Sequence, residues 1–496
     1  MSNFSEILEF QELKEEEIIN IRCDVSGQLV LLKLDNIEEI EETCITLSNS
    51  LTRKLTLKEE ANLRWAYYWL NLYEPEVNAS NVERVTGYIK AFGHLCKLSL
   101  FKEASKVLFT YTSQTDDRTL YNRLLTWGYY DDLIPLCKQL LYRVDRTIDC
   151  ECLSGLGKAH IEVGQFEQAI QLNQKGLEVA CLIDDKRFMT TFLGNLGRVY
   201  SHVGEFQKAI GFHKQQLKFA KKYSFLTEQG NALYGLGNCY NNSSQIGQAI
   251  YFFSKALSIF RETSDREAEG MTLGALGSAY DRVGKFKKAT SFIQEHLNIS
   301  CQTQNSFQQW LASYNLGCNY INLKQYNDSL KYFQKCLDIS RDSKDRYRES
   351  MTSHAFGVAY TRLKQYLDAI KSFQEALEIS NEIAHGGGQA MALLNLSHCY
   401  SFLAQTQVAF SYSNKAIEIA HKIGASDIKA FAKSSLAHAY WQEKKYIHAL
   451  ILVLQSLLIL KPWQNANGRY ILAETIGKIG GIICGFFSEI SARFIN

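Results

Sequence analysis

The chain has 496 residues, 46% of them hydrophobic, and a formal net charge of +2. It is long enough to bury a large core, while the near-neutral charge argues against a protein whose whole surface attracts nucleic acid. Only three prolines occur, which favours long uninterrupted helices because proline breaks helix interiors.

Residues 1–57 form an acidic N-terminal segment. Residues 1–60 hold 14 acidic and 6 basic side chains, a net charge of −8. Two interpretations stand side by side: a solvated acidic helix, or a segment that contacts a basic face of the same molecule. Residues 26–32 fit a turn with a short strand as well as they fit a helix. The start of the chain lacks the basic and apolar regions of a signal peptide.

Residues 58–149 are predicted to form helices, arranged as about two irregular hairpins. Residues 58–72 read as an amphipathic helix rich in Trp and Tyr, and residues 78–81 offer an N-cap for a helix that runs towards residue 98. Phe101 opens a further helix. The stretch Trp127-Gly128-Tyr129-Tyr130 predicts another hairpin turn.

Residues 150–469 contain eight copies of a 40-residue repeat. Each copy has a small residue, an aromatic residue three positions later, a second small residue twelve positions after the first, and a leucine or isoleucine eight positions further on. The first small positions are Gly157, Gly197, Gly237, Gly277, Gly317, Gly357, Ser397 and Ala437. The aromatic position is Tyr200 in the second copy and Tyr440 in the last, and His160 occupies it in the first.

This spacing predicts that each copy is a hairpin of two antiparallel helices, A and B. The small residues allow the two helices to approach closely, and a glycine such as Gly164 or Gly284 supplies the left-handed turn between them. Polar stretches at 261–266 and 341–346 are predicted turns between repeats. A single hairpin cannot bury its own apolar face, so neighbouring hairpins must stack into a solenoid.

Residues 470–496 begin in the repeat register and then depart from it. A capping helix is the expected end of a repeat array. The apolar stretch 482–487 leaves a second interpretation open, a segment that contacts a partner or a membrane surface.

The pattern of a small residue, an aromatic residue and then alanine resembles the tetratricopeptide repeat. The usual period is 34 residues, and the 40-residue period is similar to that of the long-repeat subclass, as in Pins-type adaptors and cyanobacterial repeat proteins. The region 58–149 is similar to the part that precedes the repeats in some cyanobacterial proteins, including sensor arms of signalling ATPases. The resemblance implies an all-α fold, a right-handed superhelical solenoid of antiparallel helix hairpins.

Motifs of catalysis do not occur in the sequence. It has no phosphate-binding Gly-x-x-x-x-Gly-Lys loop, no His-Glu-x-x-His and no Gly-x-Ser-x-Gly, and residues 386–388 read as a flexible glycine joint. The 13 cysteines do not follow zinc-ligand spacing. No apolar run approaches the roughly 20 residues of a membrane span. We therefore predict a cytoplasmic protein that is not an enzyme and needs no metal or cofactor.

By the resemblance, the A helices line a concave groove that binds a partner. Asparagine amides can donate to and accept from a bound main chain, and arginine can hold a carboxylate with two bonds. The predicted partner-binding residues are Lys158, Asn195, Arg198, Asn238, Arg282, Asn315, Arg362, Asn395, His398, His438 and Trp441. Simple solvation explains the polar members equally well.

Three functions remain open from the sequence. The first is a protein-interaction scaffold or adaptor that binds a peptide or helical segment of a partner protein in the groove. The second is a switchable signalling sensor whose groove is occupied by a terminal segment until a ligand displaces it. The third is an RNA-binding helical repeat protein, against which the near-neutral charge argues. Peripheral membrane contact through the C-terminus also stays open.

Overall fold

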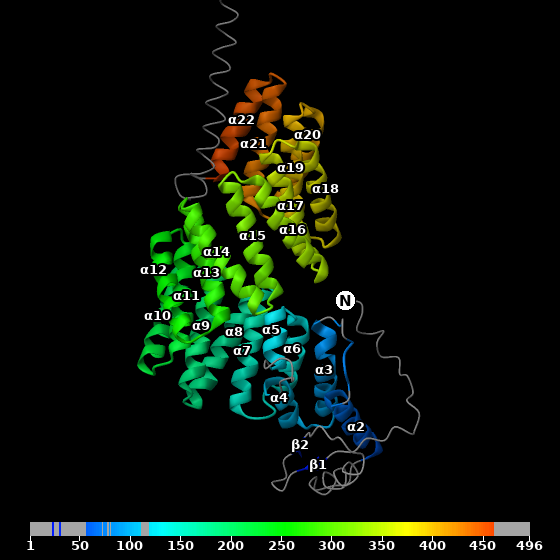
Figure 1. Cartoon of the computed structure of the whole chain (residues 1–496), viewed down its shortest axis with the longest axis vertical. Coiled ribbons are helices and arrows are strands. Elements are labelled where there is room, and N and C mark those ends of the chain that lie inside the picture. The colour runs from blue at the N-terminus through cyan, green and yellow to red at the C-terminus, as the bar shows by residue number, and fades with distance from the viewer. Residues whose placement is uncertain are drawn as a thin grey trace, which may run out of the picture. The chain divides into compact units, whose positions relative to one another are not determined.

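The computed structural model describes residues 22–23, 29–30, 56–71, 73–76, 79, 81–110 and 119–460. Two short strands, β1 (Arg22–Cys23) and β2 (Leu29–Val30), pair antiparallel, and the other regular elements of the described residues are helices (Figure 1). The helices are α2 (Leu57–Asn71), α3 (Asn81–Lys97), α4 (Phe101–Phe109), α5 (Leu120–Trp127), α6 (Tyr130–Leu140), α7 (Arg146–Glu162), α8 (Phe166–Leu182), α9 (Lys186–Val203), α10 (Phe206–Lys222), α11 (Leu226–Asn242), α12 (Ile246–Glu262), α13 (Arg266–Arg282), α14 (Phe286–Gln302), α15 (Ser306–Asn322), α16 (Tyr326–Asp342), α17 (Arg346–Arg362), α18 (Tyr366–Glu382), α19 (Gly386–Phe402), α20 (Thr406–Lys422), α21 (Ser426–Gln442) and α22 (Tyr446–Leu460).

The chain forms two compact units, Met1–Gly235 and Leu236–Asn496, and their boundary lies within α11. In each unit consecutive helices pack as antiparallel hairpins, and each hairpin packs on the next (Figure 1). From α7 onward the odd-numbered helices are the A helices of the 40-residue repeat and the even-numbered ones are the B helices. The predicted all-α solenoid of helix hairpins is confirmed.

Several predicted element boundaries agree with the structure. Phe101 begins α4, and Gly128, with φ of 80°, closes the turn between α5 and α6. The predicted capping helix at 470–496 and nearly all of the acidic segment 1–57 lie outside the described residues. The domain boundaries at 57/58, 149/150 and 469/470 stay predictions.

The small residue of each A helix lies under a side chain of its own B helix, sixteen positions later. In the second unit, a Cβ added at Gly237 or Gly357 would lie 2.5 Å from the ring of Phe253 or Phe373, respectively. Where serine replaces glycine, at Ser397, its Oγ lies 2.6 Å from the Oγ of Ser413 on α20. The small residue on the A helix therefore leaves space for a side chain of the B helix. This close packing explains why a small residue recurs at the position.

In five of the eight repeats the tyrosine of the A helix stacks on an aromatic ring twelve positions later, on the B helix. In the second unit the ring centroids of Tyr240 and Phe252 are 5.3 Å apart, and those of Tyr320 and Tyr332 are 5.4 Å apart. The same arrangement joins Tyr200 of α9 to a ring on α10 in the first unit. Where they occur, these stacks help to fix the rotation of the B helix against its A helix.

A residue in the left-handed conformation closes every described turn from A helix to B helix in the repeats. Glycine takes this place in three of them, among them Gly164 with φ of 76° and Gly284 with φ of 74°, as predicted. Other repeats hold a side chain there, for example Lys324 with φ of 60° and Ala404 with φ of 58°. Glycine is therefore the least strained residue at this position but not a necessary one.

Most A helices begin with a polar N-cap that the sequence reasoning did not identify. The carboxylates of Asp145 and Asp345 accept hydrogen bonds from backbone N–H groups three residues later, each at 2.9 Å. The prediction of a flexible glycine joint at residues 386–388 is wrong. Gly386 begins α19, and the N–H of Gly388 donates to Nδ1 of the capping residue His385 at 3.1 Å. A capped first turn holds this stretch in a helix.

The polar stretches between repeats hold ion-pair clusters, and the turns themselves are shorter than predicted. The helix α12 continues to Glu262 and α13 begins at Arg266, so only residues 263–265 turn. Arg261 and Arg266 both bind the carboxylate of Glu269, at 2.9 and 2.5 Å. The same cluster recurs 80 residues later with Arg341, Arg346 and Glu349.

Candidate functional site

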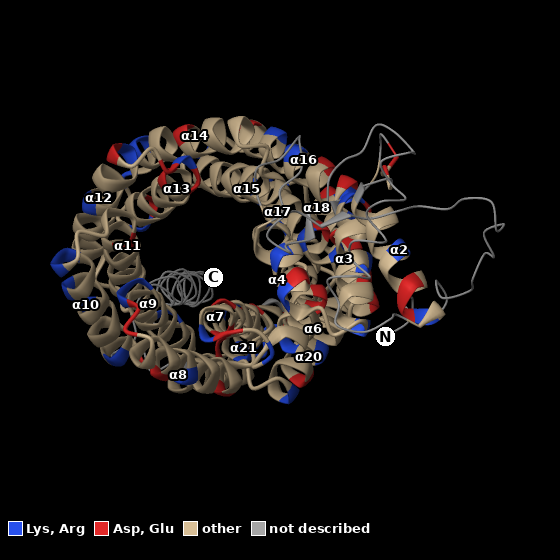
Figure 2. Cartoon of the chain, turned by 90° about the horizontal axis from the view of Figure 1, so that it is seen from below, with Lys and Arg blue, Asp and Glu red and all other residues tan. Residues whose placement is uncertain are grey.

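Two rows of side chains on the A helices remain at least partly exposed to solvent. One row lies one residue after the small position and is half-buried in every repeat, and the other lies five residues after it and is exposed wherever its side chain is described. In each unit the A helices form one layer and the B helices another (Figure 2). The backbone position in each row is constant while the residue type changes from repeat to repeat. A row of this kind can therefore present a specific pattern to a bound chain.

In the first unit, the predicted site residues Lys158 and Arg198 lie on neighbouring A helices. Arg198 forms an ion pair with Glu162 of α7. Burial and, second, the positive charge of Arg198 lower the pKa of Lys158 to about 8, with Glu151 acting in the opposite direction. Asn195 is only 7% exposed, and its amide faces Ser154 at 3.5 Å. It contributes to the contact between α7 and α9, so we leave it out of the candidate surface.

In the second unit, two predicted residues hold neighbouring helices together. The guanidinium of Arg282 donates to Oδ1 of Asn241 at 2.8 Å and to Oγ of Ser244 at 3.4 Å. The amide of Asn395 lies 2.7 Å from Nε2 of His354 and donates to the carbonyl of Met391 at 3.1 Å. These hydrogen bonds fix the two side chains and leave fewer of their polar groups available to bind a partner.

Three predicted residues of the same unit keep their polar groups available. Asn238 and Asn315 are half-buried, and no hydrogen bond joins either side chain to another residue that the structure describes. Arg362 is exposed at the end of α17 and forms no ion pair within the described part of the chain. Lys324 and Lys364 are exposed at the turns that follow α15 and α17. We call Lys324, Arg362 and Lys364 the basic ends.

Next to the basic ends lies an aromatic cluster formed by Tyr366, His398, Phe402 and His438. Phe402 is 47% exposed and stacks on Tyr366 with ring centroids 5.1 Å apart. The rings of His398 and His438 lie 4.8 and 5.8 Å from that of Phe402. Nδ1 of His438 is 2.7 Å from Oγ of Ser401, which holds the imidazole in place. Phe402 is therefore an exposed apolar contact point whose ring is held in place by three neighbouring rings.

Trp441, the last predicted residue, lies beside this cluster on α21. It is half-buried, and its ring packs against Tyr446 of α22 with centroids 4.4 Å apart. The sequence reasoning missed Tyr366 because it belongs to a B helix, outside the rows that were considered. Its place four residues after Arg362, across a tight turn, is the signal that could have identified it.

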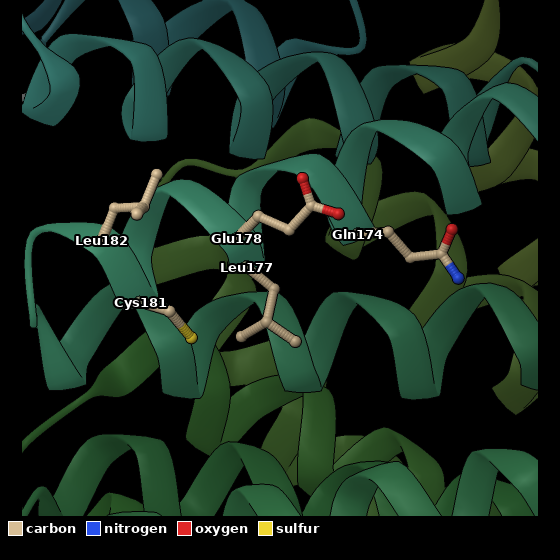
Figure 3. A pocket seen from close by; sticks show the side chains of 5 residues that line it. All are labelled: Gln174, Leu177, Glu178, Cys181 and Leu182. Atoms are coloured by element: carbon tan, nitrogen blue, oxygen red, sulfur yellow. The ribbon is translucent and has the colours of Figure 1, made fainter.

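Three further features of the described residues bear on function: a surface depression, possible metal ligands and helix length. A shallow, open depression is lined by Gln174, Leu177, Glu178, Cys181 and Leu182, all from the single B helix α8, whose side chains spread along the helix (Figure 3). No group of three or more His, Cys, Asp or Glu within the described ranges is placed to hold a metal ion. Among the helices that the structure describes, none has the length and apolar character to cross a membrane.

The comparisons with known proteins agree with this architecture. Family models described as tetratricopeptide repeat match residues 193–224, 228–302, 311–382 and 349–422. No curated protein matches the chain.

Two solved structures share the fold. One is a signal transduction ATPase with numerous domains from Pyrococcus horikoshii that carries a tetratricopeptide repeat sensor, with 17% identity and a TM-score of 0.53 over 79% of this chain and 57% of that one. The other is the apo form of the quorum sensor NprR from B. thuringiensis, with 13% identity and a TM-score of 0.52 over 77% of this chain and 100% of that one. The repeat period, the packing of the small and aromatic positions and the family matches together show that the chain contains tetratricopeptide repeats between residues 193 and 422.

Proposed function

We propose that this protein is an interaction scaffold that binds an extended or helical segment of a partner protein on the A-helix layer, and that it acts by binding rather than by catalysis. The observation that carries the proposal is the juxtaposition of the basic ends and the aromatic cluster in the second unit. There an arginine without an ion pair in the described residues lies one repeat before an exposed, braced phenylalanine.

The chemistry of this surface defines the segment that it would bind. The basic ends attract a carboxylate, and the aromatic cluster fits an apolar or aromatic side chain. Neighbouring A helices are separated by roughly 8–10 Å, a distance that an extended chain covers in about three residues. The expected ligand therefore has an acidic side chain about three residues from an aromatic or large aliphatic one.

A random peptide library displayed on phage tests the proposal directly. The library is selected on the whole chain and on the variant Arg362→Glu/Phe402→Ala. We expect selection on the unchanged protein to enrich peptides with an acidic and an aromatic residue at this spacing, and the variant to lose the enrichment. The matched control is Lys371→Glu/Tyr251→Ala, which changes an exposed lysine and an exposed tyrosine on B helices. Equal enrichment by both variants would contradict the proposed surface.

A switchable sensor is the second candidate function. Of the two solved structures described above, one is an ATPase that carries a repeat sensor and the other is a quorum sensor, which favours this alternative. The C-terminal segment of this chain carries the apolar residues 482–487, whose side chains match the aromatic cluster in character. In a sensor, this segment would occupy the A-helix surface until a ligand displaces it. Removing residues 470–496 should then tighten binding of a selected peptide, and an unchanged affinity would speak against it.

A further inference from the structure

The B helix α10 of the first unit carries a one-sided row of lysines. It contains five lysines and no aspartate or glutamate. Lys208 forms an ion pair with Glu205 at 2.6 Å. The others, Lys214, Lys218, Lys221 and Lys222, are exposed and form no ion pair with another described residue. Their spacing of four, three and one places them on one face of the helix. We call these four residues the lysine stripe.

Neither the helix dipole nor ion pairs with neighbouring acidic side chains explain why all four lysines lie on this face. Lys221 and Lys222 lie in the last turn, where positive charge complements the helix dipole. Lys214 and Lys218 lie in the middle of the helix, and like charges at this spacing repel by about 0.2–0.5 kcal/mol. The nearby acids are engaged elsewhere, since Glu178 pairs with Lys175 and Glu228 pairs with Arg187.

The shape and surroundings of the stripe indicate what could cover it. The stripe is one helix wide, and the preceding B helix, α8, has acidic side chains at Glu167 and Glu178. A broad polyanion would meet these acids, whereas a single acidic chain would not. Half-buried aromatic rings follow the stripe, with Phe219 and Tyr223 centroids 6.3 Å apart. The matching ligand is a narrow acidic segment that also carries apolar side chains.

We propose that the acidic N-terminal segment of this same chain, residues 1–57, docks on the lysine stripe. Its acids gather in two groups, six within residues 6–17 and five within residues 35–42, and apolar residues such as Ile7 and Phe10 alternate with the first group. The net charge of −8 over residues 1–60 complements four exposed lysines. Fully extended, 57 residues span at most about 190–200 Å, so reach does not limit the contact. The inference does not depend on the proposed peptide surface, which lies on the A helices of the second unit.

Zero-length carbodiimide cross-linking of the whole chain, followed by peptide mass mapping, tests the contact. The reaction joins a carboxylate to an amine only where the two already touch. At low protein concentration and about 0.02 M salt we expect cross-links from residues 6–17 or 35–42 to Lys214, Lys218 or Lys221, and their loss at about 0.5 M salt, where charge is screened within a few Å. Added heparin, a soluble polyanion that is itself a single narrow chain, should displace the segment and abolish the same cross-links.

A pair of variants separates the stripe from general charge attraction. Lys214→Glu/Lys218→Glu should abolish the cross-links to α10, including those to the unchanged Lys221, with the helical circular dichroism preserved. The matched control, Lys371→Glu/Lys415→Glu, reverses two exposed lysines on B helices of the second unit and should leave the cross-links in place. Cross-links spread over lysines of both units would overturn the proposal. So would cross-links only between molecules, or heparin binding that leaves them unchanged.

Discussion

Single residues set how closely the helices of this protein approach. In the six repeats with glycine at the small position, that glycine packs directly against a larger side chain of the B helix, so the space for a methyl group is already filled. A glycine on a B helix can instead face open space, as Gly247 does on α12. The two kinds of glycine therefore respond in opposite ways to the same substitution.

Gly357→Ala should destabilise the second unit. The added Cβ would lie 2.5 Å from Cε1 of Phe373, and overpacking of this kind costs about 1–3 kcal/mol. Gly247→Ala is the control, because no heavy atom lies within 4 Å of its added Cβ and alanine is favoured over glycine in a helix by roughly 0.5–1 kcal/mol. The thermal unfolding midpoint should fall for the first and stay or rise for the second. Equal falls would show that the close contact is not what requires glycine.

Glu349 should contribute stability that depends on pH. Burial raises the pKa of this carboxyl, but hydrogen bonds from Arg341 and Arg346 outweigh it and hold the pKa below the usual range. As the pH falls, Glu349 is therefore protonated at a higher pH in the unfolded chain than in the folded chain. The contribution is complete above the ordinary carboxyl pKa and is lost as the pH falls through the lower folded value.

The substitution Glu349→Gln tests this contribution. At pH 7 it should reduce the free energy of unfolding by about 2 kcal/mol, because it removes charge-assisted hydrogen bonds to two arginines. The difference from the unchanged protein should shrink as the pH falls through the lowered pKa of Glu349 in the folded chain. Glu378→Gln is the control, since Glu378 is exposed and forms no ion pair within the described residues. Denaturation followed at several pH values measures both, and a pH-independent difference for Glu349→Gln would rule out the ion-pair account.

At this scale the sequence predicted residue positions better than residue roles. The repeat register placed Lys158, Arg198 and Arg362 correctly on A helices. It could not tell that Arg198 is paired with Glu162 while Arg362 has no such partner among the described residues, because pairing depends on the neighbouring repeat. Asn195 was predicted on the surface and is buried. Its burial follows from the close approach of α7 and α9, which no local pattern specifies.

At the scale of helices and turns, the repeats use one geometry with different residues. The turn from A to B helix always holds a left-handed residue where it is described, but its side chain varies. A left-handed conformation costs an ordinary residue roughly 1–2 kcal/mol more than it costs glycine. The turns therefore differ in strain while they agree in shape.

Ala404→Gly should stabilise the protein and Gly204→Ala should destabilise it, each by about 1 kcal/mol. Ala404 has φ of 58° and Gly204 has φ of 87°. A Cβ added at Gly204 meets no heavy atom within 4 Å, so backbone strain is the only cost there. Thermal unfolding compares the two variants. Changes of the same sign would contradict a conformational origin.

Asp345→Ala should lower the free energy of unfolding by about 1 kcal/mol through loss of a helix N-cap. The side chain of Asp345 accepts a hydrogen bond from the backbone of Arg348 at 2.9 Å. The control is Gln365→Ala, because Gln365 precedes α18 without a side-chain capping bond. Chemical denaturation of both variants gives the comparison. A loss at Gln365 as large as that at Asp345 would mean that capping is not the cause.

The helix boundaries were largely predictable from the sequence, and the helix contacts were not. The small and aromatic positions and the turn glycines place the A and B helices within a few residues. The side chain opposite each small residue, such as Phe373 opposite Gly357, lies in another helix, and its identity becomes evident only when the two helices are packed. The predicted glycine joint at 386–388 failed because the cap, His385, is an unusual residue for that role.

At the scale of the whole molecule, two compact units built from one repeat type present different surfaces. The first unit carries the lysine stripe on a B helix, and the second carries the basic ends and the aromatic cluster on its A helices. The small and aromatic positions recur in both units while these surfaces change, so each unit combines the same helix-packing framework with its own binding chemistry. The sequence predicted the framework. It did not predict the ligand chemistry, because that depends on which side chains packing leaves unpaired.

The most direct test of the interaction role is the dissociation constant of one library-selected peptide, measured by calorimetry for the whole chain and for two double variants. Loss of a central aromatic contact and reversal of a neighbouring charge should together weaken binding by about 2 kcal/mol or more, which is roughly 30-fold. The account predicts this loss for Arg362→Glu/Phe402→Ala and an unchanged affinity for Lys371→Glu/Tyr251→Ala. Equal affinities for all three proteins would contradict a partner-binding surface on the A helices.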